Sequence, residues 1–248
     1  MNKTKIEWAD YTWNPVTGCL HGCEYCYARG IAKRFGGGEA WDRGSSHDPE
    51  LHVLHTKPEK PFPYYFAPTL HWHRMEEPQH KMKPQTIFVC SMADLFGEWV
   101  PDEWIADVIK ACEAAPQHRY LFLTKNPMRY LGLSAKEMLP ENNNFWFGST
   151  VTGEYEPSMW SDNHNTLTSI EPLLSRFSDT DSSAFKTDWV IIGAETGNRK
   201  NKVVPERSWI DDIVEYCAYI GTPVFMKDSL IPIVGEENML REYPWETV

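Results

Sequence analysis

Three of the chain's six cysteines lie within eight consecutive positions, in the stretch TGCLHGCEYCYAR. They are Cys19, Cys23 and Cys26. Thiolates this close in sequence can converge on one inorganic centre, and Gly18 and Gly22 let the backbone wrap that centre where a β-carbon would obstruct it. A disulfide would use two thiols and leave the third alone, whereas a structural zinc site would need a fourth ligand, such as His21 or a distant cysteine. The spacing therefore indicates a ligand loop.

A cubane iron–sulfur cluster accounts for three thiols and no more. When three protein thiolates hold four irons, one iron has no protein ligand and is free to bind a substrate or cofactor. We therefore predict a 4Fe-4S cluster on this loop, with chemistry at the open iron. The alternative, from a different class, is a non-catalytic zinc or iron–sulfur binding module in which the cysteines only staple the N-terminal region.

The cysteine spacing, with the aromatic Tyr25 just before the last cysteine, resembles the signature of the radical S-adenosylmethionine (SAM) superfamily. Further stretches are similar to a group of radical SAM-like proteins from phages and bacteria, and together they cover most of the chain. These stretches are FVCSMADLF, YLFLTKNP, FGSTV, SIEPLL and IIGAETG.

The resemblance implies a fold, cofactors and a reaction. The fold is a partial or complete (β/α) barrel in which the cluster loop follows the first strand. The three cysteines would hold the cluster, Tyr25 would lie near the adenine, and the open iron would bind the amino and carboxylate groups of SAM. An external electron donor such as flavodoxin or ferredoxin would drive cleavage of SAM to methionine and a 5′-deoxyadenosyl radical, which abstracts hydrogen from the substrate. Methyl transfer without radical steps is disfavoured, because no Gly-rich nucleotide loop follows the first strand.

The elements that must position this loop show an alternation of strands and helices. Short apolar runs end in small or polar residues and are near-continuously hydrophobic, which is typical of parallel strands covered on both faces. The predicted strands are 86–91, 119–124, 145–151, 166–171, 189–195 and 223–227. Segments 101–115 and 205–221 have helical apolar spacing, and Gly221 can cap the second. The pattern predicts an α/β fold, either a barrel or an open doubly wound sheet.

The N-terminal part contains a first strand, a helix and an insertion within what we expect to be one domain, 1–248. The first strand is expected within 7–19 and a helix over 27–35, stopped by the glycines of GGGE at 36–39. The region 45–85 interrupts the alternation of strands and helices and contains six of the nine histidines. It is interpreted as an insertion over one end of the barrel. The histidines of HWHR, 71–74, are expected at the surface.

Polar residues at the carboxyl ends of the predicted strands are the remaining candidates, because α/β barrels carry their reactive groups there. Family members commonly hold the SAM amino group with a Gly-Gly-Glu motif; this chain lacks it after the second strand, so Ser91 and Asp94 are assigned that role. Ser149 and Thr150 are assigned to the ribose, and Gly193 to close backbone approach at the adenine. The candidates for substrate contact are Lys125, Glu171, Glu195, Lys227 and Asp228.

These assignments compete with a simpler interpretation, in which each polar residue is an ordinary loop cap. Lys125 is expected to meet the SAM carboxylate or a substrate anion. The acidic residues at one barrel mouth would need counterions, and Lys125 and Lys227 are the proposed ones. Cys112 and Cys217 lie among apolar neighbours on predicted helices and are expected in the core.

The composition limits the partners. With 24 basic and 35 acidic residues the formal net charge is −11, which disfavours a protein that grips mainly the phosphate backbone of duplex DNA. A nucleotide, nucleic-acid base or protein substrate stays open. Every apolar run is interrupted well before the roughly 20 residues of a membrane span. No signal peptide is evident at the start of the sequence, so a cytoplasmic location is expected.

Overall fold

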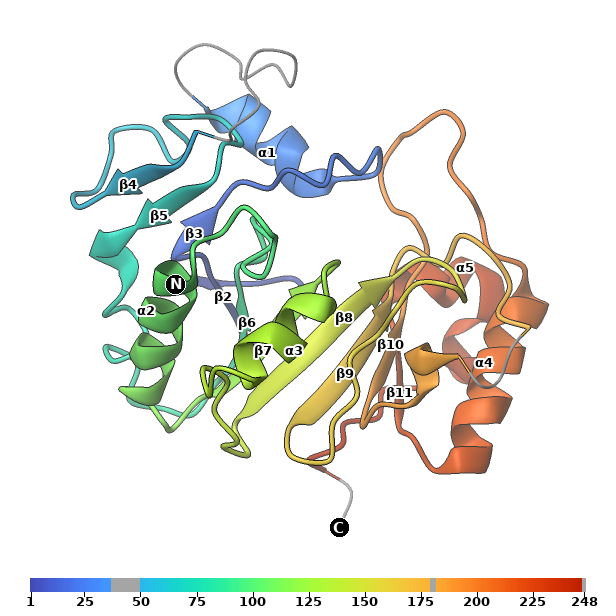
Figure 1. Cartoon of the computed structure of the whole chain (residues 1–248). Helices are drawn as coiled ribbons and strands as arrows, with labels where there is room; N and C mark the ends of the chain where they lie inside the picture. Colours follow the sequence, from blue (N-terminus) through green and yellow to red (C-terminus); the bar gives the residue numbers. More distant parts are fainter. Residues whose placement is uncertain (37–49, 179–181, 247–248) are drawn as a thin grey trace. The chain divides into compact units, whose positions relative to one another are not determined.

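The computed structural model describes residues 1–36, 50–178 and 182–246. The chain divides into two compact units, Met1–Pro140 and Glu141–Val248 (Figure 1). The expectation of a single domain over 1–248 stays a prediction. Both units consist of strands and helices, so the expected mixed α/β class is confirmed.

Parallel strands form the main sheet of the first unit. Its strands are β1 (Asn2–Lys3), β2 (Tyr11–Trp13), β6 (Thr86–Val89) and β7 (Arg119–Thr124). Their order is β1-β2-β6-β7, with β1 antiparallel to β2 and the others parallel. Consecutive residues of β7, Tyr120, Leu121 and Phe122, are all buried, which is why the run reads as continuously apolar.

Three helices belong to the first unit. They are α1 (Tyr27–Phe35), α2 (Asp102–Glu113) and α3 (Met128–Ser134). The expected helix over 27–35 is confirmed, and it ends at Gly36, whereas residues 37–39 of GGGE lie outside the described residues. Helix α2 follows Pro101, carries two acidic residues in its first turn, and buries the predicted apolar face of Trp104, Ile105, Val108 and Ile109.

The insertion forms a small sheet with the chain that leads into the cysteine loop. This sheet contains β3 (Val16–Thr17), β4 (His52–Leu54) and β5 (Thr69–His71) in the order β3-β5-β4, and a 3-10 turn, Trp72–Arg74, follows. Residues 45–49 of the predicted insertion lie outside the described residues. The insertion therefore supports β3, the last strand before the cysteines.

The expectation that the histidines of HWHR lie at the surface was wrong for His71. Its ring is fully buried, and Nε2 lies 2.8 Å from Thr17 Oγ1. Its Nδ1 has no hydrogen-bond partner among the described residues. All three residues of β5 are buried, so no alternation of buried and exposed positions marks His71 as inward, and its burial follows from the central place of β5 in the small sheet.

Acid should destabilise the protein through His71. Burial lowers the pKa of His71 to about 3, whereas the unfolded chain takes up this proton near pH 6.5. The contribution to stability is therefore complete above pH 6.5 and is lost as the pH falls from 6.5 towards 3, by about 2 kcal/mol between pH 7 and 5. His71→Gln can still bond to Thr17 but does not titrate, so its free energy of unfolding should fall by about 2 kcal/mol less over this interval. Equal decreases in denaturant titrations of the two proteins would contradict the assignment.

The second unit repeats the parallel arrangement. Its strands are β8 (Phe145–Val151), β9 (Asn165–Ile170), β10 (Val190–Ile192) and β11 (Val224–Met226), all parallel in the order β8-β9-β10-β11. Its helical segments are α4 (Arg207–Ile220), α5 (Ile231–Val234) and the 3-10 turns Ser183–Phe185, Asp228–Leu230 and Glu236–Asn238. Gly221 ends α4 in the left-handed region, as predicted.

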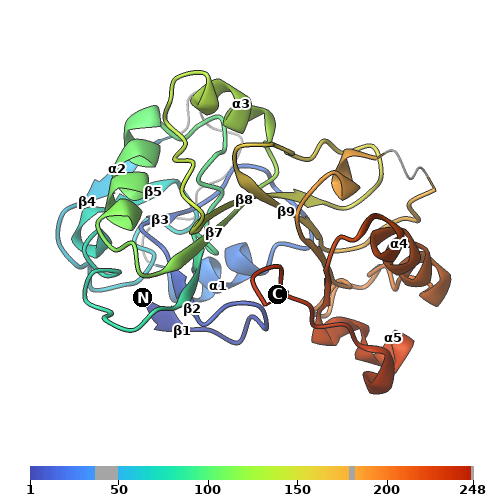
Figure 2. The same ribbon diagram turned by 90° about the horizontal axis from the view of Figure 1, so that it is seen from below.

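Helix α4 packs on this sheet through its apolar face. Ile210, Ile213 and Cys217 share one buried cluster with Ile170 and Ile192 of the strands. Figure 2 shows α4 lying beside α5, whose Val234 belongs to the same cluster. Cys217 and Cys112 are both completely buried, which confirms their expected place in the core. Among the described helices, none has the length and apolar character that crossing a lipid bilayer requires.

Candidate metal and cofactor site

The cysteine loop lies between β3 and α1 of the first unit. Cys26 caps the N-terminus of α1, and its sulfur accepts a hydrogen bond from the Arg29 backbone N–H at 3.4 Å. The Arg29 guanidinium donates to the Cys19 carbonyl at 3.4 Å, so one residue ties both ends of the loop. Cys19, Cys23 and Cys26 are free thiols with partly exposed side chains.

Both glycines of the loop adopt a backbone conformation that other residues avoid. Gly18 has φ +91° and Gly22 has φ +72°. A β-carbon on Gly18 would lie 2.1 Å from the Ala67 carbonyl oxygen, so the backbone before Cys19 is pressed against the insertion. The sequence indicated that glycine was needed here, but this close contact was not foreseen.

The segment after β6 anchors the loop. Gly18 N–H donates to the Met92 carbonyl at 2.9 Å, and the Tyr27 hydroxyl donates to the Ser91 carbonyl at 2.7 Å. Asn14 accepts from Met92 N–H at 2.8 Å and from the Ser91 hydroxyl at 3.2 Å. Ser91 thus lies beside the cysteine loop. Asn14 was missed in the sequence, although it follows β2 as the other candidates follow their strands.

Asp94 lies beneath the loop and is almost fully buried. Its carboxylate accepts from His21 Nε2 at 2.7 Å, from Phe96 N–H at 3.0 Å and from Lys125 N–H at 2.9 Å. The structure therefore brings Asp94 and Lys125 to the cysteines, as expected of residues at the ends of β6 and β7. The role of Asp94 toward an amino group stays a prediction, and three of its acceptor positions are already used.

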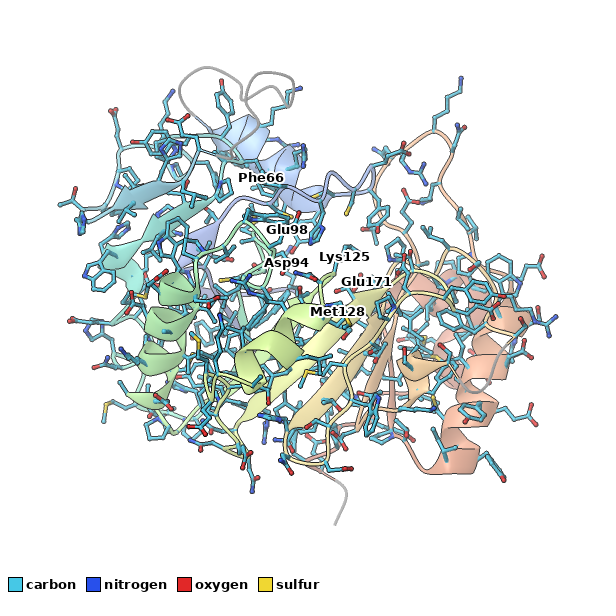
Figure 3. All side chains as sticks on the ribbon, viewed as in Figure 1. Phe66, Asp94, Glu98, Lys125, Met128 and Glu171 are labelled. Atoms are coloured by element: carbon cyan, nitrogen blue, oxygen red, sulfur yellow. The ribbon has the colours of Figure 1, made fainter. Side chains whose placement is uncertain are left out.

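Lys125 and Tyr25 also meet. The Lys125 ammonium lies 5.4 Å from the centroid of the Tyr25 ring, within the range of a cation–π interaction. Figure 3 shows Asp94 and Lys125 close together at the end of the strands of the first unit. A positive charge and a carboxylate thus contact residues of the cysteine loop, the first at the ring of Tyr25 and the second at His21.

The Cys19 thiol is strongly disfavoured as a thiolate. Burial, together with the negative charge of Asp94, raises the pKa of Cys19 to about 12. A metal that binds here must displace the proton. In the part of the chain that the structure describes, no three Cys, His, Asp or Glu side chains already meet as a metal site, so the thiols would have to converge when a cluster binds.

In the second unit, three of the predicted residues come together. Lys227, after β11, donates from its ammonium to the Glu171 carboxylate, after β9, at 2.5 Å. Gly193, after β10, lies against both side chains. The prediction that Lys227 is a counterion is confirmed for Glu171.

The other acidic candidates have arginine partners, so the counterion prediction was wrong for them. Glu195 is held by Arg199 through two bonds of 2.7 Å, and these hydrogen bonds keep the pKa of Glu195 below its usual value. Asp228 pairs with Arg241. The partners are arginines four and 13 positions further along the chain, and the strand pattern does not indicate either of them. Substrate contact by Glu195 and Asp228 stays a prediction.

The two predicted ribose-contacting hydroxyls lie at the end of β8. Ser149 is fully buried, and its hydroxyl accepts from Met159 N–H at 2.8 Å. Thr150 is half-buried. The predicted SAM contacts of Ser149, Thr150 and Gly193 stay predictions.

Gly193→Ala should disturb the Glu171–Lys227 pair. The new β-carbon would lie 3.1 Å from Lys227 Cδ and 3.2 Å from Glu171 Cγ and Cδ, so one side chain must move, at a cost of about 1–2 kcal/mol. Urea unfolding should report this loss. The matched control is Gly132→Ala in α3, where, apart from the backbone of its own helix, no described part of the chain lies within 4 Å of the added carbon and stability should not fall. A Gly193→Ala protein as stable as wild type would refute the close packing.

Comparisons with known proteins place the chain in a fold and a family. Among curated proteins none matches the sequence. A solved structure described as a cysteine-to-serine mutant of spore photoproduct lyase is similar, with a TM-score of 0.52 and 12% identity over 91% of this chain and 78% of that chain. At this identity the likeness shows the fold alone. The family model described as a protein of unknown function, DUF5131, matches residues 3–230, and the chain belongs to that family.

Proposed function

We propose that the protein is a radical SAM enzyme, with a 4Fe-4S cluster on Cys19, Cys23 and Cys26 and a barrel of the radical SAM type. The observation that carries the proposal is a single loop with three free thiols, held on the ends of β6 and β7 beside Lys125 and Tyr25. The similar solved structure, a spore photoproduct lyase, supports the proposal at the level of the fold.

The donor set suits iron–sulfur chemistry better than a structural zinc site. Three thiolates are the ligands of a cubane with one open iron. A zinc site would need a fourth ligand. The nearest candidate in sequence, His21, has its Nε2 bonded to Asp94 at 2.7 Å, which leaves only Nδ1 for a metal, and among the described residues no group of three or more Cys, His, Asp or Glu side chains meets as a metal site. When bound, the cluster would supply the electron that cleaves SAM to the 5′-deoxyadenosyl radical.

The proposal assigns a task to several residues in each unit. Lys125 brings a positive charge that suits the SAM carboxylate, and Tyr25 presents a ring of the kind that packs on an adenine. Ser91 and Asp94 are the acceptors assigned to the amino group. In the second unit, Glu171 and Lys227 are the pair that we assign to substrate contact. The substrate is a small molecule, a nucleotide or base, or a protein, and the electron donor is external.

Anaerobic reconstitution tests the function. Protein incubated with iron and sulfide under exclusion of oxygen should become brown and hold about four irons per chain. After reduction it should convert SAM to 5′-deoxyadenosine and methionine, measured by liquid chromatography. A colourless protein that binds zinc and leaves SAM intact would support the non-catalytic module instead.

A further inference from the structure

His21, between the first two cysteines, forms a hydrogen bond with a side chain from a distant part of the first unit. Its Nε2 lies 2.7 Å from the Asp94 carboxylate, 73 positions further along the chain. The Asp94 side chain is only 7% exposed and that of His21 is 22% exposed. A hydrogen bond to a carboxylate is stronger than one between neutral groups, and partial burial leaves little water to compete for it.

The Asp94 carboxylate that bonds to His21 also accepts two hydrogen bonds from the backbone. The same carboxylate accepts from the backbone N–H groups of Phe96, after β6, and of Lys125, after β7. The bond from Phe96 is local, because Phe96 lies two residues after Asp94 in the segment that follows β6, whereas Lys125 directly follows β7. The cysteine loop is thus connected through one side chain to the segment after β6 and to the end of β7.

A second contact fixes the orientation of the His21 ring. Trp99 meets it edge to face, with the ring centroids 4.9 Å apart. Trp99 is itself packed over Gly97, where any β-carbon would lie 2.4 Å from its indole. The imidazole is therefore held by a carboxylate at one nitrogen and by an aromatic ring beside it.

We propose that His21 is a positioning residue for the cysteine loop: through Asp94 it fixes the peptide between Cys19 and Cys23 on the ends of β6 and β7, where the cluster is to be held. The inference rests on the proposed function only in that the loop is taken to hold a cluster; the contacts of His21 are present without one. It gives His21 a task other than metal ligation, and it gives Asp94 a structural task beside its predicted contact with SAM.

Hydrogen exchange of the metal-free protein tests whether the bond between His21 and Asp94 holds the cysteine loop when no cluster is bound. His21→Ala should increase exchange of backbone amides in residues 18–26 about tenfold, because the charge-assisted bond is lost, with little change in the melting temperature. His21→Gln places an amide nitrogen close to the position of Nε2 and should restore most of the protection. The matched control is His80→Ala, which removes an exposed histidine of the same unit and should leave the loop unchanged.

Iron retention provides the second measurement. In reconstituted protein, His21→Ala should lose iron to a chelator several-fold faster than wild type, and His21→Gln should be intermediate. The proposal is overturned if the backbone amides of residues 18–26 exchange as slowly in His21→Ala as they do in wild type and in the His80→Ala control. If the wild-type protein takes up no iron at all, the proposed function fails, while the exchange result still decides whether His21 holds the loop.

Discussion

Cys23→Ala should abolish cluster binding and SAM cleavage while leaving the metal-free fold intact. Loss of one of three thiolates removes a ligand that no neighbouring side chain replaces in the proposed site. Loss of a residue that only orients a metal ligand already costs about 10–100-fold in metal affinity, so loss of a ligand should lower the rate of 5′-deoxyadenosine formation by more than about 100-fold. Because the Cys23 side chain is partly exposed, the free energy of unfolding of the metal-free protein should change by less than about 0.5 kcal/mol.

Cys112→Ala is the matched control, because it removes a thiol from the core of α2. This thiol is completely buried, and burial raises its pKa well above the usual value, so it is not available as a ligand. The substitution should destabilise the protein by about 1 kcal/mol and leave iron content and SAM cleavage near wild type. The opposite pattern, in which Cys23→Ala only destabilises and keeps its iron, would support a structural staple.

The strand positions could be predicted because the strands are buried on both faces. The predicted strands 119–124 and 145–151 have the same bounds as the observed β7 and β8. Most of their residues are buried, so the apolar run in the sequence ends where the strand ends. The first strand was harder. The expected strand within 7–19 is divided into β2 and β3, which join different sheets, and the division at Asn14–Pro15 has no signal in apolar spacing.

The residues of the site could be predicted only in part, because hydrophobic patterns locate strand ends and not partners. The rule for strand ends found Asp94, Lys125, Glu171 and Lys227, and the structure pairs the last two. It did not find that Asp94 bonds to His21, because nothing in the sequence relates two residues 73 positions apart. Partners close in sequence were missed for a different reason. Arg199 lies four positions after Glu195, but this segment is not a helix, so the rule that pairs charges four positions apart on a helix did not apply.

Gly18→Ala should be the most damaging substitution of a small residue in the cysteine loop. Two costs add. The backbone at φ +91° is strained for alanine, and the new β-carbon would lie 2.1 Å from the Ala67 carbonyl oxygen and 2.7 Å from that of Phe66. Both contacts are with backbone atoms of the insertion, which cannot turn aside as a side chain would. We expect a loss of about 3–5 kcal/mol in the free energy of unfolding, measured by urea titration of the metal-free protein.

Gly30→Ala shows why this loss belongs to Gly18 and not to glycine replacement in general. Gly30 lies twelve positions after Gly18 in α1, and apart from the backbone of its own helix no described part of the chain comes within 4 Å of its added β-carbon. Alanine in an exposed helix should therefore stabilise by about 0.5–1 kcal/mol, the opposite sign. If Gly18→Ala proved as stable as Gly30→Ala, the insertion would not press on the backbone before Cys19. The loop would then have to be held by its hydrogen bonds, such as those with Met92, Asp94 and Arg29.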